Sequence, residues 1–138
     1  MQKSAMVFAG ISGALAVIMG ALNAHTFREK VTSGILTAEN VGAIETAVHF
    51  QLFHTLAILG VVALGDKLPF FNKAILYCFM LGIICFSGSI YFLSTKGLTG
   101  FENINWLGPI TPLGGLFLII AWVLLGVSAL KYKPVSKQ

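Results

Sequence analysis

Residues 74–95 read AILYCFMLGIICFSGSIYFLST, and this whole stretch between Lys73 and Lys96 contains no charged side chain. A helix needs about 20 mostly apolar residues to cross the ~30 Å hydrocarbon core of a bilayer. Three other uncharged stretches reach that length: residues 4–27, 46–65 and 103–130. The spacing of the charges therefore predicts four transmembrane helices.

The composition of the whole chain agrees with this interpretation. Of its 138 residues, 57% are hydrophobic and only 10% are charged, whereas about 25% are charged in an ordinary soluble domain. A small soluble domain cannot bury so many apolar side chains. The composition therefore excludes a soluble globule, a disordered chain and a disulfide-rich secreted scaffold, and it makes the lipid bilayer the expected partner.

The net charge of +4 does not indicate nucleic-acid binding. The positions of the basic residues instead indicate how the chain is oriented in the membrane. No run of consecutive Lys and Arg residues could follow a phosphate backbone. Basic residues are more frequent in cytoplasmic loops than in loops on the other side of the membrane. One predicted side carries six of them (Lys3, Lys67, Lys73, Lys131, Lys133 and Lys137) and the other carries three (Arg28, Lys30 and Lys96). We therefore expect both termini to be cytoplasmic.

The expected fold is an all-α membrane protein, an antiparallel bundle of four transmembrane helices that forms one domain over residues 1–138. The helices are expected at about 4–25, 43–65, 72–95 and 112–131. The first is expected to be retained, because its apolar stretch is longer than the core of a signal peptide. Thr37 is predicted to cap a helix that begins at Ala38 and continues into the second span. Thr111 is predicted to cap the fourth helix ahead of Pro112.

Polar side chains inside the spans form a candidate cluster that is either structural or ligand-binding. Its members are Asn23, His25, Gln51, His54, Ser87, Ser89 and Thr111. His54 lies near the middle of its span, where a polar group usually faces the bundle interior. We expect a neutral His54 that is hydrogen-bonded to Gln51 on its own helix and to Ser87 or Ser89 across the bundle.

No catalytic residue, metal site or cofactor is predicted from these side chains. His49 and His54 are five residues apart, about 140° around a helix, so they do not form the i, i+4 pair of a zinc site. A serine nucleophile at Ser87 or Ser89 would need a base and an oxyanion site beside it. Cys78 and Cys85 lie about 10 Å apart along one helix and are expected to be packing residues.

Small residues recur at four-residue spacing, which lets membrane helices approach closely. The pairs are Ala9 and Gly13, Gly10 and Ala14, Gly20 and Ala24, Cys78 and Gly82, and Cys85 and Ser89. Gly114, Gly115 and Gly126 offer similar access on the fourth helix. These faces serve either packing within one chain or a homo-oligomer, and the sequence does not separate the two.

Four motifs in order carry a family resemblance. They are Gly20-Ala21-Leu22-Asn23-Ala24-His25, Gln51-Leu52-Phe53-His54, Phe86-Ser87-Gly88-Ser89-Ile90-Tyr91, and Thr111-Pro112-Leu113-Gly114-Gly115 followed by Trp122. Together they resemble the family called domain of unknown function 423, which comprises YgdD-like and transmembrane protein 256-like small membrane proteins. The resemblance covers residues 5–130 and implies a multi-pass protein of the bacterial inner membrane with no established biochemical role. Asn23 stands where the family motif has glycine.

The leading functional hypothesis is a non-enzymatic structural or accessory component of the plasma membrane, with no identified protein partner. The alternative is a small oligomeric transporter or channel that uses the polar cluster in the outer half of the membrane. One copy of four helices rarely encloses a pathway, and the chain shows no inverted repeat. A membrane redox or hydrolytic enzyme that uses the histidines is a third hypothesis.

Overall fold

Four long apolar helices account for most of the part of the chain that the structure describes. The computed structural model describes residues 1–65, 68, 72–101 and 103–130, and no strand occurs within them. The helices that are long and apolar enough to cross a membrane are Gln2–Thr32, Ala38–Leu64, Asn72–Thr99 and Asn105–Ala129. The prediction of an all-α protein with four spans is confirmed.

The first and third spans each contain a π-helical turn. The first consists of α1 (Gln2–Leu22), the π turn η1 (Asn23–Phe27) and α2 (Arg28–Thr32), and the third consists of α4 (Asn72–Ile83), the π turn η3 (Ile84–Gly88) and α5 (Ser89–Thr99). Both spans end later than the predicted 25 and 95. The prediction followed the uncharged stretches, whereas a helix can continue with charged residues once it has left the hydrocarbon. π turns occur frequently at functional sites.

The second span is the single helix α3 (Ala38–Leu64), which begins where the sequence predicted. The Thr37 hydroxyl accepts a hydrogen bond from the backbone N–H of Asn40 at 3.1 Å, and the Asn40 side chain accepts one from the Thr37 N–H at 3.0 Å. This reciprocal capping box satisfies two of the N–H groups that have no partner within the helix. The predicted cap at Thr37 is confirmed.

The fourth span starts with the 3₁₀ turn η4 (Asn105–Leu107) and continues as α6 (Ile110–Ala129). The predicted cap at Thr111 is wrong, because the N-cap position is Pro109 and makes no side-chain cap. The Thr111 hydroxyl is instead 2.7 Å from the Ser89 hydroxyl. The predicted helix end at 131 lies outside the described residues.

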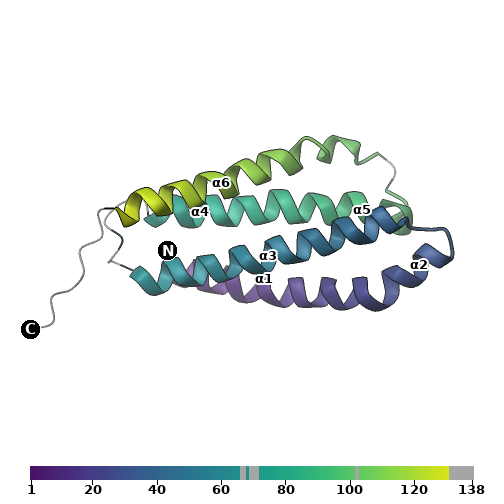
Figure 1. The fold of residues 1–138 in the computed structure, drawn as a ribbon, viewed down its shortest axis with the longest axis horizontal. Helices are drawn as coiled ribbons and strands as arrows, with labels where there is room; N and C mark the ends of the chain where they lie inside the picture. The colour runs from purple at the N-terminus through teal and green to yellow at the C-terminus, as the bar shows by residue number, and fades with distance from the viewer. Residues whose placement is uncertain (66–67, 69–71, 102, 131–138) are drawn as a thin grey trace, which may run out of the picture.

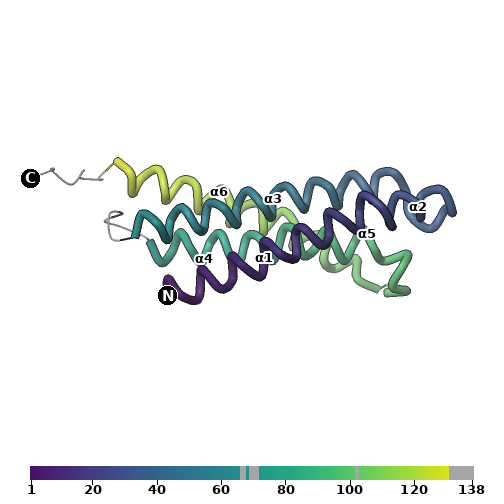
Figure 2. The backbone as a smooth tube through the Cα atoms, turned by 90° about the horizontal axis from the view of Figure 1, so that it is seen from below, coloured from purple at the N-terminus to yellow at the C-terminus, as the bar shows by residue number. Residues whose placement is uncertain are grey.

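The spans run antiparallel, and the N-terminus lies at the same end of the bundle as the end of α6 (Figures 1 and 2). α1 packs against α3, α6 packs against α4 and η3, and α3 also contacts α4 and α5. The second and third spans are therefore central and the first and fourth are peripheral. In agreement, 39% of the most apolar part of each central span is buried, against 22% in the first span and 17% in the fourth.

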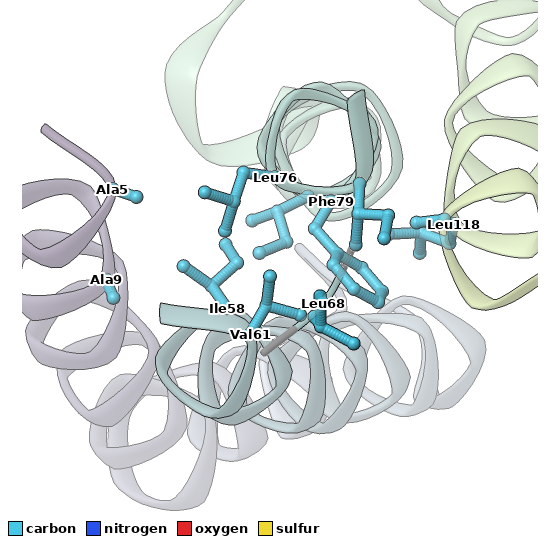
Figure 3. Packing of buried hydrophobic residues seen from close by; sticks show 11 residues of the cluster. Ala5, Ala9, Ile58, Val61, Leu68, Leu76, Phe79 and Leu118 are labelled. Carbon is cyan, nitrogen blue, oxygen red and sulfur yellow. The ribbon is translucent and has the colours of Figure 1, made fainter. Parts of the chain in front are cut away.

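Two apolar clusters lie at different levels along the bundle. The cluster nearer the termini joins all four spans through residues such as Ala5, Ile58, Phe79 and Leu118 (Figure 3). The second cluster lies toward the 33–37 loop and contains Phe27, Leu36, Val41, Ile44 and Val48. On α3 the two clusters are separated by residues 49–57, which place Gln51, His54 and Thr55 in the interior.

The contact between the third and fourth spans depends on two glycines. A Cβ atom added to Gly114 would overlap the backbone nitrogen of Phe86 and lie 2.8 Å from the backbone carbonyl carbon of Cys85. A Cβ atom added to Gly82 would overlap the side chain of Leu118. These glycines therefore serve packing within one chain, which is one of the two uses that the sequence left open for the small residues.

Candidate functional site

Gln51 is the centre of the buried polar groups. Its side-chain nitrogen donates to the backbone carbonyl of Ser12 at 2.9 Å and lies 3.3 Å from the Ser12 hydroxyl. Its side-chain oxygen accepts a hydrogen bond of 2.7 Å from the Tyr91 hydroxyl. The Ser12 hydroxyl is also 2.8 Å from the Thr55 hydroxyl. One glutamine on α3 thus joins α1 and α5, with both ends of its amide hydrogen-bonded.

Ser87 and Ser89 of the third span bind different neighbours. Ser87, which is 1% exposed, donates to the backbone carbonyl of Ala47 on α3 at 2.9 Å. Ser89 donates to the carbonyl of Phe86 at 3.0 Å. Because this uses the single proton of Ser89, Thr111 donates to the Ser89 oxygen in their 2.7 Å contact. The two serines connect the third span to the second and to the fourth.

Asn23 begins the π turn η1 and is only 4% exposed. Its side-chain nitrogen donates to the carbonyl of Val41 on α3 at 3.1 Å. Its side-chain oxygen is buried, and no hydrogen-bond partner for it occurs within the part of the chain that the structure describes. A buried acceptor without a partner costs about 1–3 kcal/mol, so Asn23 contributes less stability than its one bond suggests.

His54 is buried as predicted, with 8% of its surface exposed, but its predicted partners are wrong. Nδ1 lies 2.6 Å from the carbonyl oxygen of Phe50, one turn earlier on the same helix. A carbonyl only accepts, so Nδ1 carries the proton in this contact. The ring lies among Phe50, Phe79 and Trp122, with centroid distances of 5.6, 5.8 and 6.1 Å. Gln51 instead bonds to α1 and α5. Three helical residues rotate a side chain by about 300°, so the side chains of His54 and Gln51 point about 60° apart around α3.

His25 does not join the other candidate residues. It is exposed on η1, two residues after the buried Asn23. Glu45 and His49 are also exposed, on the outer side of α3. Six of the seven candidate residues are therefore interior or half-buried and the seventh is on the surface.

Three residues that make these bonds between spans were missed from the sequence, namely Ser12, Thr55 and Tyr91. Ser12 shares a helical face with the buried Ala5, Ala9 and Ala16, and this periodicity is the signal that could have identified it. Thr55 follows Gln51 by four residues and so lies on the same face of α3. Tyr91 lies within one of the motifs that resembled the family, but its hydroxyl partner depends on packing.

We define the interhelical polar network as the residues that make these bonds between spans: Ser12, Asn23, Gln51, Thr55, Ser87, Ser89, Tyr91 and Thr111. Each hydrogen bond of this kind contributes about 0.6 kcal/mol in a membrane. The Ser87 proton is held by a peptide carbonyl, which cannot serve as a general base. Among the described residues, no group of three His, Cys, Asp or Glu side chains lies close enough together to hold a metal ion.

Comparison with known proteins gives full-length relatives. The chain is 34% identical to the UPF0382 membrane protein YwdK of Bacillus subtilis, over 95% of this chain and 99% of that protein. It is 35% identical to the UPF0382 inner membrane protein YgdD of Escherichia coli K12, over 96% and 95%. A UPF0382 membrane protein of Haemophilus influenzae is 32% identical over 98% and 100%. No solved structure gives a significant match.

The sequence profile of the family described as "Protein of unknown function (DUF423)" matches residues 19–115. This region extends from the end of α1 into the first turns of α6, so it contains most of the interhelical polar network. The long apolar helices and the full-length relatives make the chain a multi-pass protein of the bacterial inner membrane. The chain belongs to the DUF423 family of membrane proteins, whose biochemical role is not established.

Proposed function

We propose that this chain is a non-enzymatic structural or accessory component of the plasma membrane, acting as a single domain. The observation that carries the proposal is that most of the buried polar side chains make hydrogen bonds between spans. Gln51 joins α1 to α5, Ser87 joins η3 to α3, and Ser89 joins α5 to α6. A serine or glutamine that is hydrogen-bonded in this way stabilises helix packing.

The peripheral spans support an accessory role because they present long apolar faces. Ile18 on α1 is 53% exposed and Ile119 on α6 is 61% exposed. Gly13 and Gly20 face α3, at 3.8 Å from Thr55 and 3.5 Å from Val48 for an added Cβ atom. Gly10 has open space around it, so the outward part of α1 is where a second copy or a partner helix would approach.

The accessory role can be tested by photo-crosslinking in living cells. A photoreactive amino acid is placed at Ile18 or Ile119, and the fully buried Ile75 is the control position. We expect a discrete protein adduct from at least one outward position and none from the control. Adducts from neither outward position would contradict the proposal.

The transporter alternative is tested with the purified wild-type protein reconstituted into phospholipid vesicles. We expect the flux of protons, potassium and chloride to equal that of vesicles without protein. A flux that rises with protein content would overturn the proposed role in favour of a transporter or channel. The mass of the complex released from the vesicles reports whether the chain is a homo-oligomer.

We also propose that both termini are cytoplasmic, because basic residues are more frequent on that side of the four spans. A reporter that is active only outside the cytoplasm should give no signal when it is fused to the C-terminus. It should give a signal when it is inserted into the 33–37 loop. The opposite pattern would reverse the orientation.

A further inference from the structure

A cavity of about 840 Å³ lies between the first span and the third span. We call it the α1–α5 groove. On one side it extends from Phe8 on α1 to Phe27 on η1, and on the other from Ile83 on α4 to Thr99 on α5. A helix rises about 1.5 Å per residue, which gives the second side a length of roughly 24 Å.

The groove has apolar walls and a floor whose polar groups already have partners. Ile11, Leu15, Ile84 and Phe92 line the walls, whereas Gln51 and Tyr91 lie among the lining residues as the main polar groups. The Gln51 amide and the Tyr91 hydroxyl are hydrogen-bonded to each other, and Gln51 also binds Ser12. An occupant therefore needs no polar group within the groove, and an apolar one gains the most from entering it.

The walls are continuous with the surface that faces lipid. Ile11, Leu15, Ile84 and Phe92 are 58%, 50%, 56% and 58% exposed, so each side chain belongs to the groove and to the outer apolar surface. The medium at this depth is hydrocarbon, and an acyl chain can pass from the bilayer into the groove without crossing a polar barrier. Lipid is the occupant that already contacts both edges.

The length and the apolar lining of the groove fit one acyl chain. One leaflet contributes about half of the ~30 Å hydrocarbon core, so a length of roughly 24 Å accommodates the whole acyl chain of one leaflet.

We propose that the α1–α5 groove is a binding site for one acyl chain of a membrane phospholipid. The lipid belongs to the leaflet next to the 33–37 loop, because the groove extends from the middle of α1 toward that end. Thr95 and Thr99 line that end of the groove and mark the level at which the chain meets its headgroup. The site holds its lipid whether or not the protein has the accessory role proposed above.

The test fills the groove from Gly88. This glycine lines the cavity, and a Cβ atom added to it meets no other atom within 4 Å, so the side chain of Gly88→Leu projects into the space that the lipid would use. Gly60→Leu is the matched control. Gly60 also lies within a span, has nothing within 4 Å of an added Cβ atom, and does not line the groove.

The measurement is native mass spectrometry of protein released from vesicles of phosphatidylethanolamine and phosphatidylglycerol. We expect the wild-type chain and Gly60→Leu to retain one phospholipid each. Gly88→Leu should retain about tenfold less, which corresponds to ~1.4 kcal/mol of binding free energy. Helix content and elution volume confirm that each variant is folded.

A second pair keeps the test decisive if Gly88→Leu does not fold. Leu15→Trp fills the groove from α1, and Leu56→Trp places the same ring on the exposed face of α3, where Leu56 is 63% exposed and lies outside the groove. Lipid retention that is equal within a pair would overturn the proposal, as would a wild-type chain released without lipid. A dimer that is lost only in the groove variants would show a second copy in the groove and would also overturn it.

Discussion

Gly114→Ala should separate the third and fourth spans, because the added methyl group would meet backbone and not a flexible side chain. The Cβ atom would overlap the nitrogen of Phe86 and lie 2.8 Å from its Cα atom. Carbon atoms pack at about 3.5–4.0 Å, so the two helices must move apart by roughly 1 Å. A gap of that size forfeits between about a quarter and a half of the attraction of each affected contact.

The cost of this movement can be estimated. Overpacking in a close-packed interior costs about 1–3 kcal/mol, and the bond between Ser89 and Thr111 that joins the same two spans contributes about 0.6 kcal/mol. Gly126→Ala is the control, since it lies on the same helix and has nothing within 4 Å of an added Cβ atom. Both variants share the change in helix propensity. We therefore expect Gly114→Ala to be about 2–3 kcal/mol less stable than Gly126→Ala.

The assay is reversible unfolding in mixed micelles, in which sodium dodecyl sulfate replaces a mild detergent and tryptophan fluorescence reports the folded fraction. The free energies of unfolding are compared at a common micelle composition. A difference between the two variants below about 0.5 kcal/mol would refute the reasoning, because it would mean that α6 can move away from η3 without losing contacts.

Four further outcomes follow from individual contacts. Gly82→Ala should be destabilising alone and largely rescued by Leu118→Ala, because its clash is with that side chain; independent effects in a double-mutant cycle would contradict this. Tyr91→Phe should lower the free energy of unfolding by about 1–3 kcal/mol, since it leaves the buried side-chain oxygen of the network glutamine without its hydrogen-bond donor. His54→Phe should change stability by less than about 1 kcal/mol, because its ring already packs among aromatic rings; the loss of a stoichiometric ligand with stability intact would contradict a structural role. Asn23→Ala should be nearly neutral, since the loss of one hydrogen bond is offset by removal of a buried acceptor that lacks a partner. A loss of stability above about 2 kcal/mol in the same unfolding assay would contradict that expectation.

The number of spans and the all-α fold class could be predicted from the sequence, because the bilayer sets a minimum length for every helix that crosses it. Four uncharged stretches, each long enough to cross the hydrocarbon core, leave few other solutions in a medium where each backbone N–H and C=O needs a partner. The cap at Thr37 was also predictable, since it depends on residues three apart in the chain. The family motifs identified the membership that the full-length relatives confirm.

The partners of the interior side chains could not be predicted in this way. The sequence placed His54 in the interior of the bundle, which its burial confirms, but the bonds predicted to Gln51 and the serines were wrong. The rotation of each span about its axis decides such bonds, and the π turns change that rotation partway along the first and third spans. A single residue of offset turns a side chain by about 100°, which is enough to exchange one neighbouring helix for another.

The sequence by itself therefore determined that this protein is a four-span membrane protein, because hydrophobic length and local capping are properties of continuous segments. Only the tertiary structure decided that Ser12 and Tyr91 bind Gln51, that Gly114 meets the backbone of Phe86, and that a groove separates α1 from α5. These features depend on the relative rotation and separation of helices that are distant in sequence. Lipid solvates every apolar helix face equally well, so hydrophobicity alone could not specify which helix faces pack against each other.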